Sequence, residues 1–337
     1  MSTRFASLLI GGLAALTTPA LAASGGEHWV GDFDEAVDLA RKQNKDLLVD
    51  FTGSDWCIWC KRLDKEVFSE QAFLDAAQKD FVLVALDFPH SDEAKAKVPN
   101  PDRNKELSEK YEVHGFPTVL LMNPDGEVYA KTGYRPGGAA PYVENLTEIR
   151  KTGREALVST RELLKSFAAA DAAGKAALWE KVMAQFDKLD GDSPFAAQLA
   201  GPVRWGIESD PKNEKGTKLR AIEALMKAGL AADADLAMAR DLDPDNRSGL
   251  LERVVEAQFR SVQDDESAKA AVTALDALAA KGFKDKKVGF KLHLTAARWY
   301  AEPLADPAAS KRHAEAAKAI GSDDEEAMKV LEQLLAG

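Results

Sequence analysis

The sequence contains very little cysteine, with only two in 337 residues. Exported domains that depend on disulfides for stability usually carry many cysteines, so this scarcity excludes a disulfide-stapled scaffold. A closed zinc site is also disfavoured, because it needs four ligands. The five histidines are not paired at ligand spacing along the chain. We therefore expect no bound metal and no other cofactor.

The chain also lacks any block of basic residues. Its formal net charge is −11 and its pI is near 5.1. An acidic surface opposes binding to nucleic acid and to anionic lipid, which attract clustered Lys and Arg. Long apolar runs are missing after the N-terminus, so no membrane span is expected there. These absences predict a chain that binds neither nucleic acid nor a membrane.

The first residues have the pattern of a secretory signal. Arg4 supplies a positive start, residues 5–16 form a short apolar core, and residues 20–22 (Ala-Leu-Ala) match a small-x-small cleavage site. A core of about twelve residues is too short for a stable membrane anchor. We predict that residues 1–22 are a signal peptide and that the mature protein is periplasmic or secreted. An uncleaved N-terminal helix is the alternative.

The two cysteines, Cys57 and Cys60, stand three positions apart, soon after an apolar run at residues 47–51 that is typical of a buried strand. A bond between them would close almost no chain, so it would add little stability. At the start of a helix, Cys57 would be favoured as a thiolate by the peptide dipoles. Cys60, one turn later, would resolve a mixed disulfide. The pair therefore indicates reversible thiol-disulfide exchange.

The first half of the chain alternates predicted helices and strands. A helix is expected at residues 32–44 and another from about residue 141, which together with the strands gives an α/β fold with a mixed sheet flanked by helices. Polar residues and prolines between 88 and 104 predict a surface loop or insertion without a role, with shaping of access to the cysteine pair as the alternative. The predicted strands are residues 47–51, 81–87, 118–122 and 127–132.

Two sequence motifs together resemble the active-site loops of the thioredoxin-like superfamily. They are Trp56-Cys57-x-x-Cys60-Lys61, preceded by Val49-Asp50-Phe51, and Gly115-Phe116-Pro117-Thr118. The stretch 55–68 is similar to exported thioredoxin-family proteins and to the C-terminal domain of thiol:disulfide interchange proteins. The resemblance covers residues 28–150 and implies a thioredoxin-like domain there.

The same resemblance implies roles for individual residues. Cys57 is the attacking thiol and Cys60 the resolving thiol. The Phe116–Pro117 bond is expected to be cis, which would place the backbone of Phe116 beside the dithiol to pair with an extended substrate. Trp56 is expected to shield the dithiol and to contact substrates, with core packing as the alternative.

One acidic residue departs from the family pattern. The usual buried acid stands six positions before the first cysteine, where this chain has Phe51, and Asp50 lies seven positions before Cys57. Two interpretations stay open. Asp50 is either the base that assists the resolving thiol or a buried strand aspartate satisfied by backbone donors.

Trp59, the residue just before Cys60, indicates the direction of electron flow. Strongly oxidising members of the superfamily have a histidine at this position. An uncharged ring stabilises the thiolate less, so the disulfide is more stable and the reduced protein is a better electron donor. The sequence therefore favours a reductase or an isomerase-like exchanger.

Residues 154–337 are rich in Ala, Leu, Lys and Glu and predict only helices. Asp210-Pro211-Lys212-Asn213 recurs 33 positions later as Asp243-Pro244-Asp245-Asn246. This spacing resembles tetratricopeptide-type helical hairpins, which stack and display a partner-binding surface. A generic helical bundle is the alternative. We expect an all-α, repeat-like domain that binds a protein partner.

Taken together, these features predict an exported thiol-disulfide oxidoreductase. It would act on protein thiols and disulfides through Cys57 and Cys60, and it would need an electron donor or acceptor that the sequence does not identify. The alternative is a non-catalytic binding or scaffold protein that uses a thioredoxin fold and helical hairpins to recruit a partner. Fast alkylation of reduced Cys57 would favour the enzyme, and an inert pair would favour the scaffold.

Overall fold

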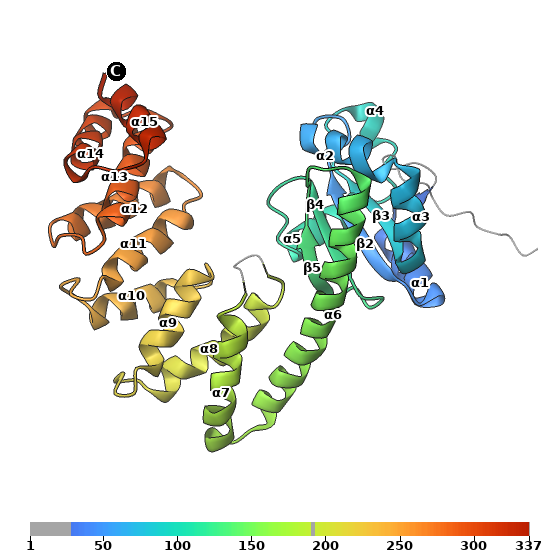
Figure 1. The fold of residues 1–337 in the computed structure, drawn as a ribbon, viewed down its shortest axis with the longest axis horizontal. Helices are drawn as coiled ribbons and strands as arrows, with labels where there is room; N and C mark the ends of the chain where they lie inside the picture. Colours follow the sequence, from blue (N-terminus) through green and yellow to red (C-terminus); the bar gives the residue numbers. More distant parts are fainter. Residues whose placement is uncertain (1–27, 190–192, 337) are drawn as a thin grey trace, which may run out of the picture. The chain divides into compact units, whose positions relative to one another are not determined.

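The computed structural model describes residues 28–189 and 193–336. The predicted signal peptide, residues 1–22, lies outside the described residues. Internal contacts divide the chain into two compact units, one ending at Leu157 and the other beginning at Val158 (Figure 1).

The N-terminal unit is built on a five-stranded sheet with the order β1-β3-β2-β4-β5. Strand β2 pairs parallel with β3 and antiparallel with β4, so the predicted mixed sheet is confirmed. All residues of β2, β3 and β4 are buried, which fits their nearly continuous apolar runs. The sequence did not predict β1, which has only two residues. The strands are β1 (Trp29–Val30), β2 (Asp46–Thr52), β3 (Phe81–Asp87), β4 (Thr118–Met122) and β5 (Val128–Thr132).

Helices flank this sheet, and Figure 1 shows α6 running along it. Helix α1 begins at Asp32, whose carboxylate accepts the N–H groups of Asp34 and Glu35, and it ends where Asn44 turns into the left-handed conformation. The segment 88–104 was expected to be a loop, but it contains α4 and the start of α5. The helices are α1 (Phe33–Gln43), α2 (Ile58–Leu63), the π-helical turn η2 (Asp64–Phe68), α3 (Gln71–Asp80), α4 (Asp92–Lys95), α5 (Pro101–Lys110) and α6 (Ala139–Ala169).

A cluster of aromatic rings fixes the helix that follows the cysteines. Phe68, at the end of η2, has its ring 4.8 Å from that of Trp29, 5.0 Å from Phe73 and 5.8 Å from Tyr142. These rings belong to β1, α3 and α6, so one side chain joins the end of η2 to three elements. Offset and edge-to-face ring pairs of this kind add stability beyond their buried area.

Asp46 holds the first part of α6 against the sheet. It is fully buried at the start of β2. Its carboxylate accepts hydrogen bonds from the Tyr129 hydroxyl at 2.8 Å, from Arg150 Nε at 2.9 Å and from Arg154 at 3.1 Å. A buried carboxylate is tolerated only with such a complete set of donors.

Every regular element that the structure describes after Val158 is a helix. Consecutive helices pack against each other, and α11 also contacts α9 and α13. Apolar stripes in the sequence predict helices at residues 154–170, 175–189, 215–230, 250–262, 268–280, 288–300, 310–319 and 325–335, so α8 and α10 were not predicted. Helix α8 contains Pro202 and two glycines, and α10 is short and rich in aspartate. The helices are α7 (Ala172–Phe186), α8 (Ala196–Ser209), α9 (Thr217–Lys227), α10 (Asp233–Leu242), α11 (Leu250–Arg260), α12 (Asp265–Ala279), α13 (Lys286–Ala301), α14 (Pro307–Ile320) and α15 (Glu325–Ala336).

The two Asp-Pro loops that echo each other in the sequence also share their hydrogen bonds. The carboxylates of Asp210 and Asp243 each accept three backbone N–H groups, from the residues four, five and seven positions ahead. Each loop leads into a helix of eleven residues, α9 or α11. The residues with a left-handed backbone conformation also occupy equivalent positions in the two loops, Asn213 with Asn246 and Gly216 with Gly249.

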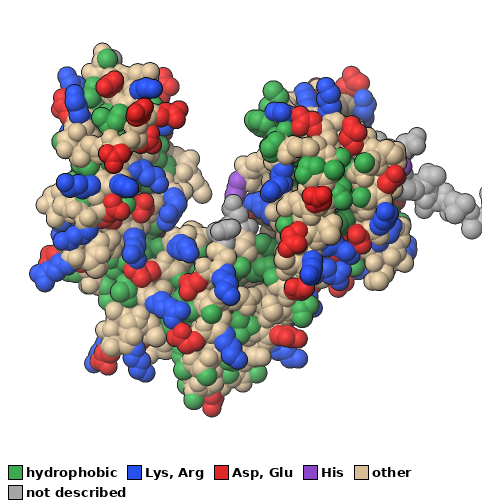
Figure 2. Space-filling view, in the orientation of Figure 1, with side chains coloured by type: hydrophobic (Ala, Val, Ile, Leu, Met, Phe, Trp, Pro, Cys, Tyr) green, Lys and Arg blue, Asp and Glu red, His purple; other side chains and the backbone are tan. Residues whose placement is uncertain are grey.

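No helix in the described ranges combines the length and the apolar character needed to cross a bilayer. Figure 2 shows acidic and basic side chains intermixed on the visible face of the helical unit, without a large block of one sign on that face.

Candidate active site

The two cysteines form a disulfide at the start of α2, with their Cα atoms 5.3 Å apart. Cys57 is the residue that caps the helix, and its Sγ accepts the backbone N–H of Cys60 at 3.1 Å. Cys57 is 5% exposed and Cys60 is 4% exposed. A sulfur at a helix start faces unpaired N–H groups, which favour the thiolate after reduction.

The proline turn lies at the same end of the sheet as the disulfide. The Phe116–Pro117 peptide bond is cis, as predicted. Thr118, the next residue, begins β4 opposite Phe51 of β2, the strand that leads to the cysteines. The Trp56 ring meets the Phe116 ring edge-on with a centroid distance of 5.6 Å. The structure therefore brings Trp56, Phe116 and Pro117 beside the dithiol loop.

Trp56 is a partly exposed ring and not a core residue, with 41% of its surface open. Its Nε1 donates a hydrogen bond to the Phe88 carbonyl at 2.8 Å. Its ring stacks on His90, with centroids 4.7 Å apart and planes within 7°. Both partners come from the segment after β3, so this segment fixes the orientation of Trp56.

Asp55 also ties the dithiol loop to that segment. Its carboxylate accepts the backbone N–H of Ser91 at 2.7 Å and that of His90 at 2.9 Å. These two hydrogen bonds lower the pKa of Asp55 from 3.8 to about 2. Residues 88–91 were expected to belong to a loop without a role, but they hold the residues before Cys57 in place.

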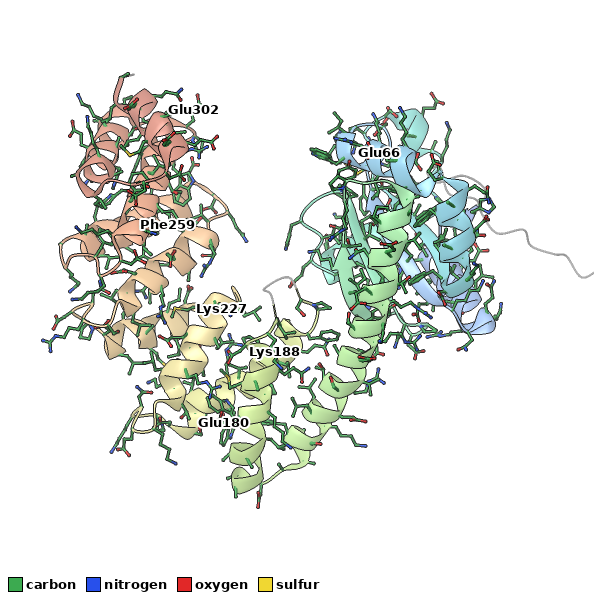
Figure 3. All side chains as sticks on the ribbon, viewed as in Figure 1. Glu66, Glu180, Lys188, Lys227, Phe259 and Glu302 are labelled. Carbon is green, nitrogen blue, oxygen red and sulfur yellow. A yellow bond between two sulfur atoms is a disulfide. The ribbon has the colours of Figure 1, made fainter. Side chains whose placement is uncertain are left out.

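A second group of aromatic residues lies on α2 and after β5. Trp59 is 50% exposed, and its ring centroid is 5.3 Å from that of Tyr134. The Arg62 guanidinium lies over both rings, at 5.7 and 5.2 Å. Glu66, labelled in Figure 3, accepts hydrogen bonds from Arg62 and from the Tyr134 hydroxyl. Sequence reasoning missed Tyr134, because only the fold brings the chain after β5 to α2.

Asp50 is buried in β2 and lacks backbone donors. Its Oδ1 has no hydrogen-bond partner within the described residues. Burial, followed by the charge of Asp64, raises the pKa of Asp50 from 3.8 to about 8, although a hydrogen bond with the Thr52 side chain acts in the opposite direction. Backbone N–H groups of the described residues therefore do not satisfy Oδ1, and the role of Asp50 as a base stays a prediction. A carboxyl with this pKa can accept or release a proton near neutral pH.

Among residues 28–189 and 193–336, no group of three or more His, Cys, Asp or Glu side chains is arranged to hold a metal ion. His114, three residues before Pro117, is exposed. The chemistry that this site offers is that of the dithiol.

Comparison with known proteins also indicates thiol-disulfide chemistry. A family model described as a thioredoxin-like domain matches residues 33–140, within the N-terminal unit. The chain is 30% identical over 119 residues to the disulfide bond reductase DsbH of Chlamydia pneumoniae, a match that covers 35% of this chain and 70% of that protein. It is 37% identical over 91 residues to a thiol:disulfide interchange protein DsbD of Pseudomonas fluorescens, covering 27% of this chain and 14% of the relative.

A solved structure named DsbH oxidoreductase is 30% identical to the chain. That match covers 42% of this chain and 94% of the solved one, with a TM-score of 0.33.

Proposed function

The chain belongs to the thioredoxin-like family of thiol-disulfide oxidoreductases, and on this premise we propose that it is an exported reductase of protein disulfides. The observation that carries the proposal is the position of Cys57, which caps α2 beside the cis-proline turn. There a thiolate is stabilised by helix N–H groups and stands next to a backbone segment suited to an extended substrate.

The reaction begins with the reduced pair. The Cys57 thiolate attacks one sulfur of a substrate disulfide, the substrate S–S bond breaks, and the second substrate sulfur leaves as a thiolate. The Cys60 thiol then gives up its proton and attacks Cys57 Sγ, which releases the first substrate sulfur. The substrate gains two electrons and the enzyme is left as the Cys57–Cys60 disulfide. A dithiol donor must then reduce this disulfide to complete the cycle.

Asp50 is the group that we assign to accept the Cys60 proton. An efficient base has a pKa near the working pH, and burial raises the pKa of Asp50 to about 8. The same carboxyl, once protonated, can return the proton when the disulfide is reduced again.

The exposed rings of Trp56 and Trp59, on either side of Cys57, support binding of an extended polypeptide. We assign Trp56, Phe116 and Pro117 to this surface, as predicted from the sequence. Trp59 and Tyr134 extend it on the side of α2. Large rings of limited flexibility contribute contact area at a low entropic cost.

The proposed direction of electron flow and the proposed location of the protein rest on separate features. Trp59 before Cys60 favours the disulfide over the thiolate and so favours electron donation. Residues 1–22 have the signal pattern, which supports a periplasmic or secreted protein. The DsbH relative is named a disulfide bond reductase.

We assign residues 154–337 to partner recruitment. Equivalent loops at Asp210 and Asp243, and the contact of α11 with both α9 and α13, support a stack of helical hairpins. A scaffold without thiol chemistry is the second candidate, because the low exposure of both cysteines favours an inert pair.

Two serine variants test the enzymatic proposal. Cys57→Ser should abolish reduction of a disulfide-bonded test protein, whereas Cys60→Ser should accumulate a mixed disulfide between Cys57 and the substrate, visible as a band sensitive to reductant. The double variant is the matched control and should form no such band. Full reductase activity in both single variants would refute the proposal.

A further inference from the structure

The helical unit contains a cavity of about 410 Å³ formed by α9, α11 and the residue after α7. Lys227, labelled in Figure 3 at the end of α9, is one of its lining residues. Most of the charged lining residues occur in equivalent pairs, 33 positions apart: Arg220 with Arg253, Glu223 with Glu256, and Lys227 with Arg260.

The arginines of the first equivalent pair, Arg220 and Arg253, are neutralised inside the unit. Arg220 of α9 forms ion pairs with Glu180 at 2.8 Å and with Asp187 at 3.6 Å. Arg253 of α11 pairs with Glu223. These charges join neighbouring helices and are not free for a ligand.

The cations of the last equivalent pair, Lys227 and Arg260, have no acidic partner in an ion pair among the described residues. Lys227 and Arg260 are the last residues of α9 and α11, and both are exposed. The Lys227 ammonium donates a hydrogen bond to the backbone carbonyl of Asp187 at 3.4 Å, and the Arg260 guanidinium donates one to the backbone carbonyl of Met226 at 3.0 Å. A lysine has three donors and an arginine five, so both keep donors for a bound anion.

The two cations lie close enough for one polypeptide to reach both, because Arg260 donates a hydrogen bond to the carbonyl of Met226, the residue before Lys227. An extended chain advances about 3.3 Å per residue, so flexible acidic side chains about three residues apart can reach both. The carboxylate of Glu256 lines the same cavity and would repel a ligand with continuous negative charge, such as a nucleic acid, whereas the Glu223 carboxylate is paired with Arg253.

We propose that this cavity binds an extended acidic segment of a protein partner, with carboxylates of the segment paired to Lys227 and Arg260. Repeated helical pairs display such surfaces on successive equivalent helices. The site does not involve the dithiol, so it can exist whether or not the protein is a reductase.

Binding of cysteine-free fluorescent peptides to the full chain tests the site without thiol exchange. One peptide carries Glu at every third position with proline between, which keeps it extended, and the second carries Gln instead. The Glu peptide should bind about tenfold more tightly than the Gln peptide. Lys227→Gln combined with Arg260→Gln should remove this difference.

Two further variants separate recognition of charge from loss of fold. Lys269→Gln with Lys291→Gln removes the same charge from exposed positions that do not line the cavity, and it should change affinity by less than about twofold. Lys227→Arg with Arg260→Lys keeps the charge and should keep binding. Equal affinity for the two peptides, or an equal loss in the Lys269 and Lys291 variant, would overturn the proposal.

Discussion

Two aspartates five positions apart, Asp50 in β2 and Asp55 in the loop after it, show how surroundings set the charge of a side chain. Asp55 is on the surface and accepts two backbone N–H groups, so its pKa falls to about 2. Asp50 is buried five residues earlier with an unpartnered oxygen, so its pKa rises to about 8. Only Asp50 is therefore suited to exchange a proton with a thiol near neutral pH.

Replacing Asp50 should raise the free energy of unfolding and lower the rate of disulfide reduction. Because the Asp50 pKa is higher in the folded state, folding takes up a proton between about pH 4 and pH 8, and the free energy of unfolding falls as pH rises through that window. Asp50→Asn should raise the free energy of unfolding at pH 8 by about 2 kcal/mol, measured by urea denaturation. Disulfide reduction should fall at least about tenfold.

Asp125→Asn, which changes an exposed carboxylate, is the matched control for this prediction. An Asp50→Asn variant that matched the wild type in both stability at pH 8 and activity would contradict the assignment of Asp50.

The sequence predicted some residues of the site better than others. Cys57, Cys60 and the cis Phe116–Pro117 bond belong to short motifs, so local order was enough to find them. The environment of Asp50 could not be predicted, because the donors near a side chain depend on neighbouring strands and helices. The same holds for Tyr134, which meets Trp59 only through the fold.

At the scale of elements, apolar periodicity predicted the strands β2 to β5 and most helices. It failed where the pattern was short or interrupted, as in β1, α8 and α10. The segment after β3 is polar and rich in proline, so it resembled a free loop. Its hydrogen bonds with Asp55 and Trp56 are made by backbone groups, which leave no mark on the sequence, and the ring of His90 stacks on Trp56 only because the fold brings the two together.

Helices α13 and α14 are joined by a buried histidine pair that lies twenty positions apart in the sequence. His293 Nδ1 and His313 Nδ1 are 3.0 Å apart. Arg312 lies 3.3 Å and Asp276 3.9 Å from Nε2 of His313. Burial, and then the charge of His313, lowers the pKa of His293 to about 4, and burial also lowers the pKa of His313.

This pair should make the helical unit sensitive to mild acid. The unfolded chain binds more protons than the folded one between about pH 6.5 and pH 4, so stability falls as pH drops through that window. The loss should be about 2 kcal/mol, followed by circular dichroism during urea denaturation at pH 7 and pH 4.5. The double variant His293→Gln/His313→Gln should flatten this dependence, whereas His114→Gln should not. An unchanged dependence in the double variant would contradict the prediction.

At the scale of the whole molecule, composition predicted an α/β part followed by an all-α part, and the described residues have this order. The limits of 28–150 and 154–337 stay predictions, and α6 runs through the gap between them as one helix. Gly153 lies inside α6 where a Cβ would come within 2.5 Å of the Tyr129 carbonyl, so a close approach explains this glycine. In the sequence alone, a glycine that close packing requires cannot be distinguished from a glycine that ends a helix.

The reduction potential of the Cys57–Cys60 pair tests the reductase assignment most directly. The full chain is equilibrated in glutathione buffers of known potential, and the fraction of reduced pair is measured by trapping free thiols with an alkylating reagent. A value near −270 mV, roughly that of strongly reducing members of the family, is the expected result. A value near −120 mV, roughly that of a strong oxidant, would contradict it.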